Sequence, residues 1–203
     1  GFATLTDVFV HTGVITTAST SSSDWKFSKF TWGTANAAAN APNVGANKWK
    51  FTITGGLRAF YGVTNPSEKI LKIAILFRSG NGNTVQRNAD GSDMYVPVYD
   101  NGVYARIDVP LRTPMFNMGF ETINKSINDN IAITAKASQA SDIKLYFNGA
   151  LLSTTTSATQ ASANPTITAN GNQEIVAEAI VGSVKHSDTL RFLVAPPVNV
   201  APL

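Results

Sequence analysis

The 203-residue sequence predicts an all-β protein that consists of two antiparallel β-sandwich domains in tandem. Three observations support this fold class. Apolar and polar residues alternate with a period of two in many short segments, glycine–asparagine clusters separate these segments, and helical periodicity is almost absent. The length accommodates either one large domain or two domains of about 100 residues each.

Strands in the first half are predicted from alternation and from the turns that follow it. In the segments 48–54 and 71–77 the odd positions are apolar, and in the second of them Lys72 and Arg78 lie on the opposite face. Residues 34–45 are rich in alanine, but their asparagines and a proline predict a loop. A turn is predicted at residues 79–83. Strands are predicted at 94–99 and 103–109, and they are expected to form a hairpin around Asp100-Asn101-Gly102.

Strands in the second half are predicted in the same way. Turns are expected at Asn148-Gly149 and at residues 170–172. The residues expected in the core of this half are Ile131, Ile133, Ala135, Ile143, Leu145, Phe147, Ile175, Ala177, Ala179, Val181, Leu190, Phe192 and Val194.

A domain boundary is predicted at residues 109–114, because Pro110 and Pro114 disfavour a central strand there and favour an extended connector. All three tryptophans precede this segment, and the chain after it is richer in Ala, Ser and Thr. The predicted domains are therefore residues 1–111 and 112–203, the second ending in a proline-rich linker at 195–203.

The composition excludes several kinds of chemistry. The absence of cysteine rules out disulfides, thiolate metal sites and cysteine nucleophiles. Only 14% of the residues are charged, and the net charge of +3 is spread along the chain, so a nucleic-acid groove is not expected. The longest apolar runs, such as Ile73 to Phe77, are far shorter than the roughly 20 residues that cross a bilayer, so no membrane-spanning segment is expected. No cofactor is expected either. A weakly charged surface suits an uncharged partner.

The aromatic segment 24–32 does not fit a regular strand. Trp25 and Phe27 have one parity and Phe30 and Trp32 the other, so one core cannot bury both pairs. Either a β-bulge realigns them or one pair faces outward. An outward tryptophan can stack on the apolar face of a sugar ring, whereas the alternative is that both tryptophans are core residues.

Two further candidates are weaker. His11 points away from the core if Val8 and Val10 point into it, and the alternative is a histidine satisfied within the core. Asp90 and Asp93 could supply oxygen ligands to calcium, but the segment lacks the full spacing of a calcium loop, and an Asx turn explains it without a metal. Trp49 shares a face with Phe51 and is expected in the core.

Six sequence blocks of the first half are VFVHTGVI (8–15), DWKFSKFTWGT (24–34), NKWKFTIT (47–54), FYGV (60–63), EKILKIAILFR (68–78) and ADGSDMYVPVY (89–99). Together they resemble a non-catalytic domain that precedes the catalytic barrel in secreted α-amylase-family enzymes of polysaccharide-utilising Gram-negative bacteria. That domain is similar in layout to starch-binding carbohydrate-binding modules. The second half, through DIKLYFNGALLSTTT (142–156) and VAEAIVGSVKHSDTLRFLV (176–194), resembles bacterial immunoglobulin-like linker domains.

The resemblance implies a non-enzymatic, monomeric module that binds starch or maltooligosaccharides and targets an attached glycoside hydrolase to them. It also implies secretion or an outer cell-surface location. Such modules use a His or Tyr on an early strand and two tryptophans, which match His11, Trp25 and Trp32. The resemblance further implies that Lys26 or Lys29 hydrogen-bonds the sugar hydroxyls and that Tyr61 is a further candidate for the aromatic platform. The alternative is a pair of structural spacer domains that bind no glycan.

Overall fold

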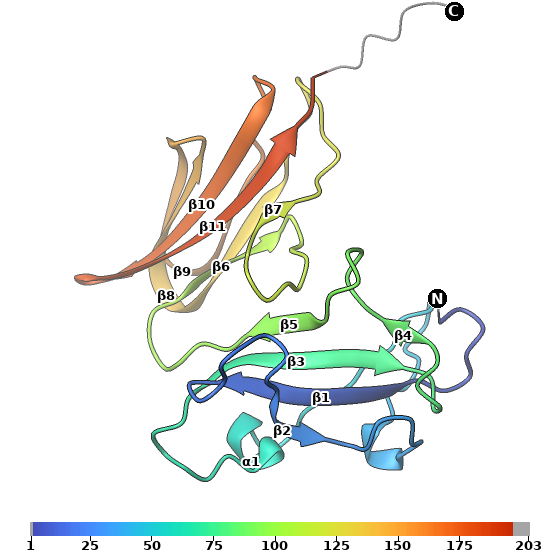
Figure 1. The fold of residues 1–203 in the computed structure, drawn as a ribbon. Coiled ribbons are helices and arrows are strands. Elements are labelled where there is room, and N and C mark those ends of the chain that lie inside the picture. Colours follow the sequence, from blue (N-terminus) through green and yellow to red (C-terminus); the bar gives the residue numbers. More distant parts are fainter. Residues whose placement is uncertain (1, 197–203) are drawn as a thin grey trace, which may run out of the picture. The chain divides into compact units, whose positions relative to one another are not determined.

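The computed structural model describes residues 2–196, which form two compact units built almost entirely of β-strands (Figure 1). The N-terminal unit contains the described residues up to Val98 together with Pro114–Asn117. The C-terminal unit contains Tyr99–Thr113 together with the described residues from Met118 onward. The predicted all-β class, with two antiparallel β units in tandem, is confirmed.

A five-stranded sheet forms the frame of the N-terminal unit. Strand β1 lies between β2 and β3, and the far edge of β3 pairs with both β4 and β5, all antiparallel. The turn of residues 79–83 joins β3 to β4, as predicted. The strands are β1 (Phe9–Thr16), β2 (Lys26–Lys29), β3 (Ile70–Arg78), β4 (Val85–Gln86) and β5 (Met94–Pro97).

The two faces of this sheet are covered by different parts of the chain. On the first face, Val10 and Val14 pack beneath the 3-10 turn η1 (Ala37–Ala39) and the short helix α1 (Leu57–Tyr61), which lie on one side of the sheet (Figure 1). The second face carries His11 and, across from it on β3, Leu76. Since residues alternate along each strand, Gly13, Ala74 and Arg78 belong to this second face too.

Two strand predictions for the N-terminal unit are wrong in detail. Residues 50–54 join no sheet; the apolar–polar alternation is present, but the segment covers the first face, and its sheet-like pairing is limited to a bridge between Asn43 and Trp49. In β3 the face expected to be polar is the more buried one. Arg78 is fully buried, because both faces of the sheet are covered, whereas Leu71 at the start of the strand is exposed.

The predicted hairpin of residues 94–109 is also wrong, and the units divide the chain differently from the predicted 111/112 boundary. Strand β5 pairs with β3, whereas β6 (Ala105–Val109) joins the sheet of the C-terminal unit. Residues 114–117 return to the N-terminal unit, where the Tyr95 N–H donates to the Pro114 carbonyl at 2.6 Å and the Phe116 ring packs on Tyr95. These contacts with Tyr95 explain why residues 114–117 belong to the N-terminal unit.

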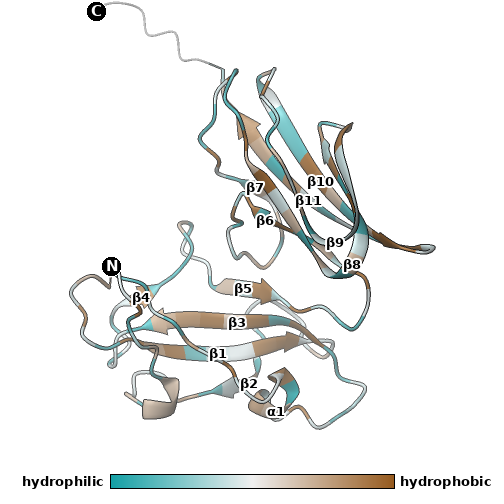
Figure 2. Cartoon of the chain, turned by 180° about the vertical axis from the view of Figure 1, so that it is seen from behind, coloured by the Kyte–Doolittle hydropathy of each residue, from teal (hydrophilic) through white to brown (hydrophobic). Residues whose placement is uncertain are grey.

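The C-terminal unit is a six-stranded sheet in the order β6-β8-β10-β11-β7, and β9 also pairs with β8. Strands β6 and β10 pair with different parts of β8, residues 134–137 and 142–147. Its core contains every predicted alternating residue except Val181. Figure 2 shows both brown and teal stretches along β10 and β11. The Asn148-Gly149 turn joins β8 to β9 with both residues at positive φ. The strands are β7 (Phe120–Glu121), β8 (Ile133–Phe147), β9 (Ala150–Ala163), β10 (Gly171–Val181) and β11 (Val184–Val194).

Side chains of β11 close this unit against β6. The Ala105 N–H donates to His186 Nδ1 at 3.1 Å, and the Ile107 N–H donates to Asp188 Oδ2 at 2.7 Å. Arg112 pairs with the same Asp188 carboxylate at 2.9 Å. His186 and Asp188 therefore have structural roles. Most of the predicted C-terminal linker lies outside the described residues, and no helix within residues 2–196 is long and apolar enough to cross a membrane.

Candidate functional site

Three aromatic side chains meet on the second face of the N-terminal sheet. The His11 ring stacks on Trp25 with centroids 5.8 Å apart and meets Trp32 edge-on at 5.2 Å. We call His11, Trp25 and Trp32 the aromatic cluster. The three residues come from different parts of the sheet, because His11 lies on β1, Trp25 directly precedes β2 and Trp32 follows β2.

A β-bulge in β2 makes this convergence possible. Thr12 pairs with Lys29 and Val14 with Lys26, so β2 contains one residue more than β1 across this interval. Phe27 and Phe30 have positive φ values of 51° and 68°. Phe30 consequently enters the core of the first face, while the tryptophans on either side of β2 reach the second face. A β-bulge, one of the two alternatives predicted for segment 24–32, is therefore present.

The aromatic cluster lines an open hollow of about 420 Å³. Trp25 is half-buried, whereas Trp32 is 42% exposed and offers its ring to solvent. Polar groups complete the wall: the hydroxyls of Ser23 and Ser28 and the ion pair between Arg87 and Asp93. This arrangement can stack an apolar ring and hydrogen-bond the polar groups at its edge.

The hydrogen bond of His11 fixes which ring nitrogen is free. His11 Nδ1 lies 3.0 Å from the Phe30 carbonyl oxygen, which can only accept, so Nδ1 carries the proton. Burial lowers the pKa of His11, and the nearby Arg78 lowers it further, against raising contributions from the Phe30 carbonyl and Asp93. Neutral His11 therefore keeps a lone pair on Nε2 for accepting a hydrogen bond from a ligand.

The lowered pKa of His11 makes the stability of the N-terminal unit depend on pH. Because the folded state disfavours the charged ring, the contribution is complete above the ordinary pKa of 6.5 and is lost as the pH falls through the lowered value. Between about pH 7.5 and about pH 5, we expect the parent to lose more free energy of unfolding than His11→Gln does. Urea unfolding followed by tryptophan fluorescence reports this unit alone, since all three tryptophans lie in it. Equal losses in both proteins would contradict the assignment.

Trp25 is held from behind by Tyr95 and the chain that precedes it. Its indole N–H donates to the Ser22 carbonyl at 3.1 Å and approaches the Tyr95 hydroxyl at 3.3 Å. The Tyr95 hydroxyl also donates to the Ser22 carbonyl at 2.7 Å, and the two rings meet edge-on at 6.3 Å. These contacts fix the orientation of the Trp25 ring.

Trp32 is held by Arg78 and by the turn between β3 and β4. The guanidinium lies 5.6 Å from the Trp32 ring centre, and Arg78 Nη2 donates to the carbonyls of Thr31 and Thr34, which precede and follow Trp32 in the sequence. Arg78 Nη1 donates to two carbonyls of the turn, at Ser79 and Gly80, so one side chain joins the Trp32 loop to this turn.

The other residues predicted at the site do not line the hollow. Tyr61 ends helix α1 rather than a strand, is 3% exposed and hydrogen-bonds Thr12 at 2.7 Å, so it is a core residue. Lys26 pairs with Asp24 at 2.8 Å, and the Lys29 ammonium lies over the Phe60 ring, away from the aromatic cluster.

Asp90 and Asp93, the acidic candidates for a metal site, are already bonded to other groups of the protein. The Ser92 N–H donates to Asp90 Oδ1 at 2.9 Å, which is the predicted Asx turn, and Asp93 pairs with Arg87. Hydrogen bonds from Ser92 lower the pKa of Asp90. Within residues 2–196, no three or more metal-ligating side chains gather into a group that could hold a metal ion.

Sequence reasoning missed the polar wall of the hollow. Arg87 and Asp93 lie six positions apart on the two sides of a turn in which the Asn88 N–H donates to the Ser92 carbonyl. Opposite charges that flank a turn of this kind are a usable signal for a paired Arg and Asp. Their position beside the tryptophans depends on the packing of β4 and β5 along one edge of β3.

The aromatic cluster and the Arg87–Asp93 pair are thus the features of this chain from which a function can be argued. No protein-family model matches the sequence, and a search of curated proteins finds no significant match.

Proposed function

We propose that the N-terminal unit is a non-catalytic module that binds a neutral glycan, an α-glucan such as starch, and that the C-terminal unit is a spacer. In this proposal the chain belongs to a secreted or cell-surface amylase-type enzyme of a Gram-negative bacterium and targets it to polysaccharide. The observation that carries the proposal is the convergence of His11, Trp25 and the exposed Trp32 on one open hollow.

The chemistry of the hollow suits a sugar better than a charged ligand. A pyranose presents apolar C–H groups on its faces, which stack on an indole ring, and hydroxyls around its rim. His11 Nε2 can accept from one hydroxyl, while Arg87 donates to and Asp93 accepts from others. Because the opposite charges of Arg87 and Asp93 compensate each other, the wall carries little net charge.

The choice of an α-glucan rests on the resemblance of residues 8–99 to domains of amylase-family enzymes, and the hollow itself supports a neutral sugar ring. The low charged fraction of 14% agrees with a neutral ligand.

A second candidate function is that both units are structural spacers. It is favoured by the internal use of Trp25, whose N–H is bonded to Ser22 and whose ring packs beside buried Ile15 and Tyr95. The spacer function does not explain why Trp32 is exposed. An exposed tryptophan next to another aromatic ring commonly marks a contact site.

Binding experiments on the parent chain separate the two functions. We expect retarded migration in gels that contain soluble starch, and calorimetry with maltoheptaose to give a Kd on the order of 0.1–1 mM. Cellohexaose, compared with maltohexaose of the same length, serves as the matched β-linked control and should bind more weakly. No retardation together with no heat would favour the spacer function, and equal binding of both oligosaccharides would argue for a glycan module without preference for α-linkages.

Gly82 provides a test of whether the orientation of Trp32 matters. A Cβ at Gly82 would lie 2.7 Å from Trp32 Nε1, so Gly82→Ala should displace the indole and weaken maltoheptaose binding about fivefold. Gly91→Ala is the matched control: Gly91 has a similar φ of 82°, against 76° at Gly82, but its Cβ would meet no atom within 4 Å. Both variants should lose about 1 kcal/mol of stability from backbone strain, and only the first should lose binding. Equal affinities would show that Trp32 does not contact the glycan.

A further inference from the structure

We propose that the glycan surface continues past Arg87 into a second hollow, lined by Phe2, Trp49 and Phe77, which takes further sugar residues of the same chain. This inference rests on the proposed function and adds to it a second subsite and a dependence of affinity on chain length.

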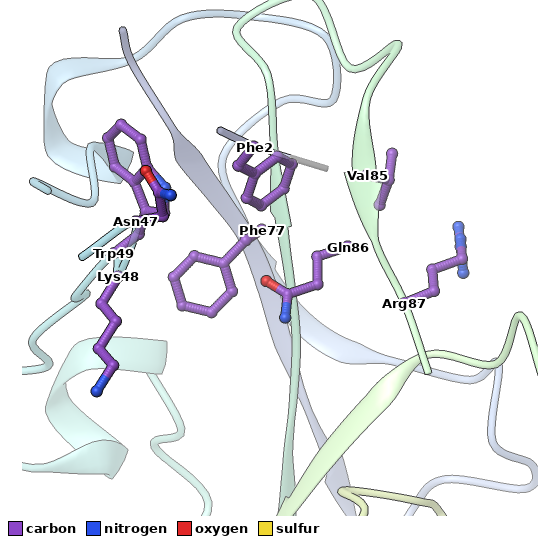
Figure 3. Close-up of a pocket in the computed structure, with 8 residues that line it drawn as sticks. All are labelled: Phe2, Asn47, Lys48, Trp49, Phe77, Val85, Gln86 and Arg87. Carbon is purple, nitrogen blue, oxygen red and sulfur yellow. The ribbon is translucent and has the colours of Figure 1, made fainter. Parts of the chain in front are cut away.

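The second hollow is larger than the first, with a volume of about 680 Å³ against about 420 Å³. In Figure 3 the rings of Phe2 and Phe77 lie between Trp49 on one side and Val85 and Arg87 on the other. Phe77 of β3 and Gln86 of β4 are direct partners in the sheet, so the floor of this hollow is part of the rigid frame.

Arg87 connects the two hollows because it lines both of them. Strand β4 is only two residues long and lies on the edge of the sheet, so its side chains reach both faces within a short distance. Gln86 is paired with Phe77 on the first face, whereas the next residue, Arg87, pairs with Asp93 beside the aromatic cluster. A flexible oligosaccharide that leaves the aromatic cluster along Arg87 therefore meets the second hollow next.

The lining of the second hollow suits the same ligand chemistry. Three aromatic rings supply apolar surface for stacking, and the amides of Asn47 and Gln86 supply donors and acceptors for hydroxyls. The charged side chains of the lining are Lys48 and Arg87, and the second of these is already paired with Asp93. These charges disfavour a cationic ligand, and the aromatic rings with the two amides suit a neutral ring with hydroxyls.

Calorimetry with maltose through maltoheptaose tests the continuation. In the parent, maltoheptaose should bind about tenfold more tightly than maltotriose, because only the longer ligand reaches both hollows. In the double variant Phe2→Ala/Gln86→Ala this ratio should fall to about twofold while maltotriose affinity stays unchanged. Gln86 is exposed, whereas Phe2 is half-buried against the core of the first face. Urea unfolding of the double variant therefore has to show a cooperative transition before its binding ratio is read. Lys50→Ala, at an exposed position beside Trp49 that does not line the hollow, is the matched control and should keep the tenfold ratio.

The indole N–H resonance of Trp49 in a nitrogen–proton NMR spectrum gives a second readout. It should move on addition of maltoheptaose and stay in place with maltotriose, whereas the Trp32 resonance should move with both. If maltotriose binds but the ratio in the parent is near one, or the double variant keeps the ratio, the second hollow is not a subsite and the proposed function stands. If neither oligosaccharide binds, the second subsite and the proposed function both fail.

Discussion

Replacing Arg78 by methionine is expected to lower the free energy of unfolding of the N-terminal unit by about 3 kcal/mol. Arg78 is fully buried and donates to four backbone carbonyls at 2.8–3.2 Å, so methionine leaves these carbonyls without their charged donor. Within residues 2–196 no carboxylate pairs with Arg78. Its charge is balanced by carbonyl dipoles and by the rings of Phe9 and Trp32.

Urea unfolding followed by tryptophan fluorescence measures this effect, and Arg58→Met is the matched control. Arg58 also donates to two backbone carbonyls, at 2.6 and 2.7 Å, but it is exposed, so water can replace it and the loss should stay below about 1 kcal/mol. Arg78→Lys should remain destabilising, because an ammonium cannot span the carbonyls of Thr31 and Gly80 as the guanidinium does. A loss in Arg78→Met no larger than that in Arg58→Met would contradict the assigned role.

Alternation predicted the strands well where each strand has one buried face. In β8, β10 and β11 the predicted apolar residues form one core, because a shift by one residue would expose all of them. The segment 48–54 shows the limit of this reasoning. Its alternation reflects half-burial against the first face, which an extended chain achieves without a sheet partner. Periodicity reports burial, and pairing has to be inferred separately.

The burial of Arg78 and the path of residues 94–117 could not be predicted from local sequence. Arginine is seldom fully buried, and the carbonyls that satisfy Arg78 come from residues up to 47 positions away. The Asp100-Asn101-Gly102 signal coincides with a bend at residues 101–102, but the strands on its two sides belong to different units. Tertiary pairing of β5 with β3 and of β6 with β8 decided the outcome.

The candidate site was partly visible because it breaks a local rule. The conflicting parities of Trp25 and Trp32 indicated that segment 24–32 is not a regular strand. In the structure a β-bulge and the positive φ values of Phe27 and Phe30 resolve the conflict. The Arg87–Asp93 pair was not associated with the tryptophans, because its place depends on how β3, β4 and β5 pair.

Trp32→Ala is expected to weaken maltoheptaose binding at least about tenfold, which corresponds to about 1.4 kcal/mol. Trp32 is the most exposed ring of the aromatic cluster, so its removal takes away stacking surface with little cost in core packing. Trp25→Ala is a poorer test, because Trp25 packs against the buried residues Ile15 and Tyr95 and its loss would also destabilise the unit. Calorimetry and starch-gel migration measure the effect.

Phe27→Ala is the matched control for Trp32→Ala, since Phe27 is an exposed ring on β2 that does not line the hollow. A nonspecific hydrophobic contribution to binding would be reduced by either substitution, whereas stacking in the hollow is removed by Trp32→Ala alone. Parent-like affinity in Trp32→Ala would therefore exclude the aromatic cluster as the glycan site. Equal weakening in both variants would indicate that exposed aromatic surface attracts the ligand without a defined site.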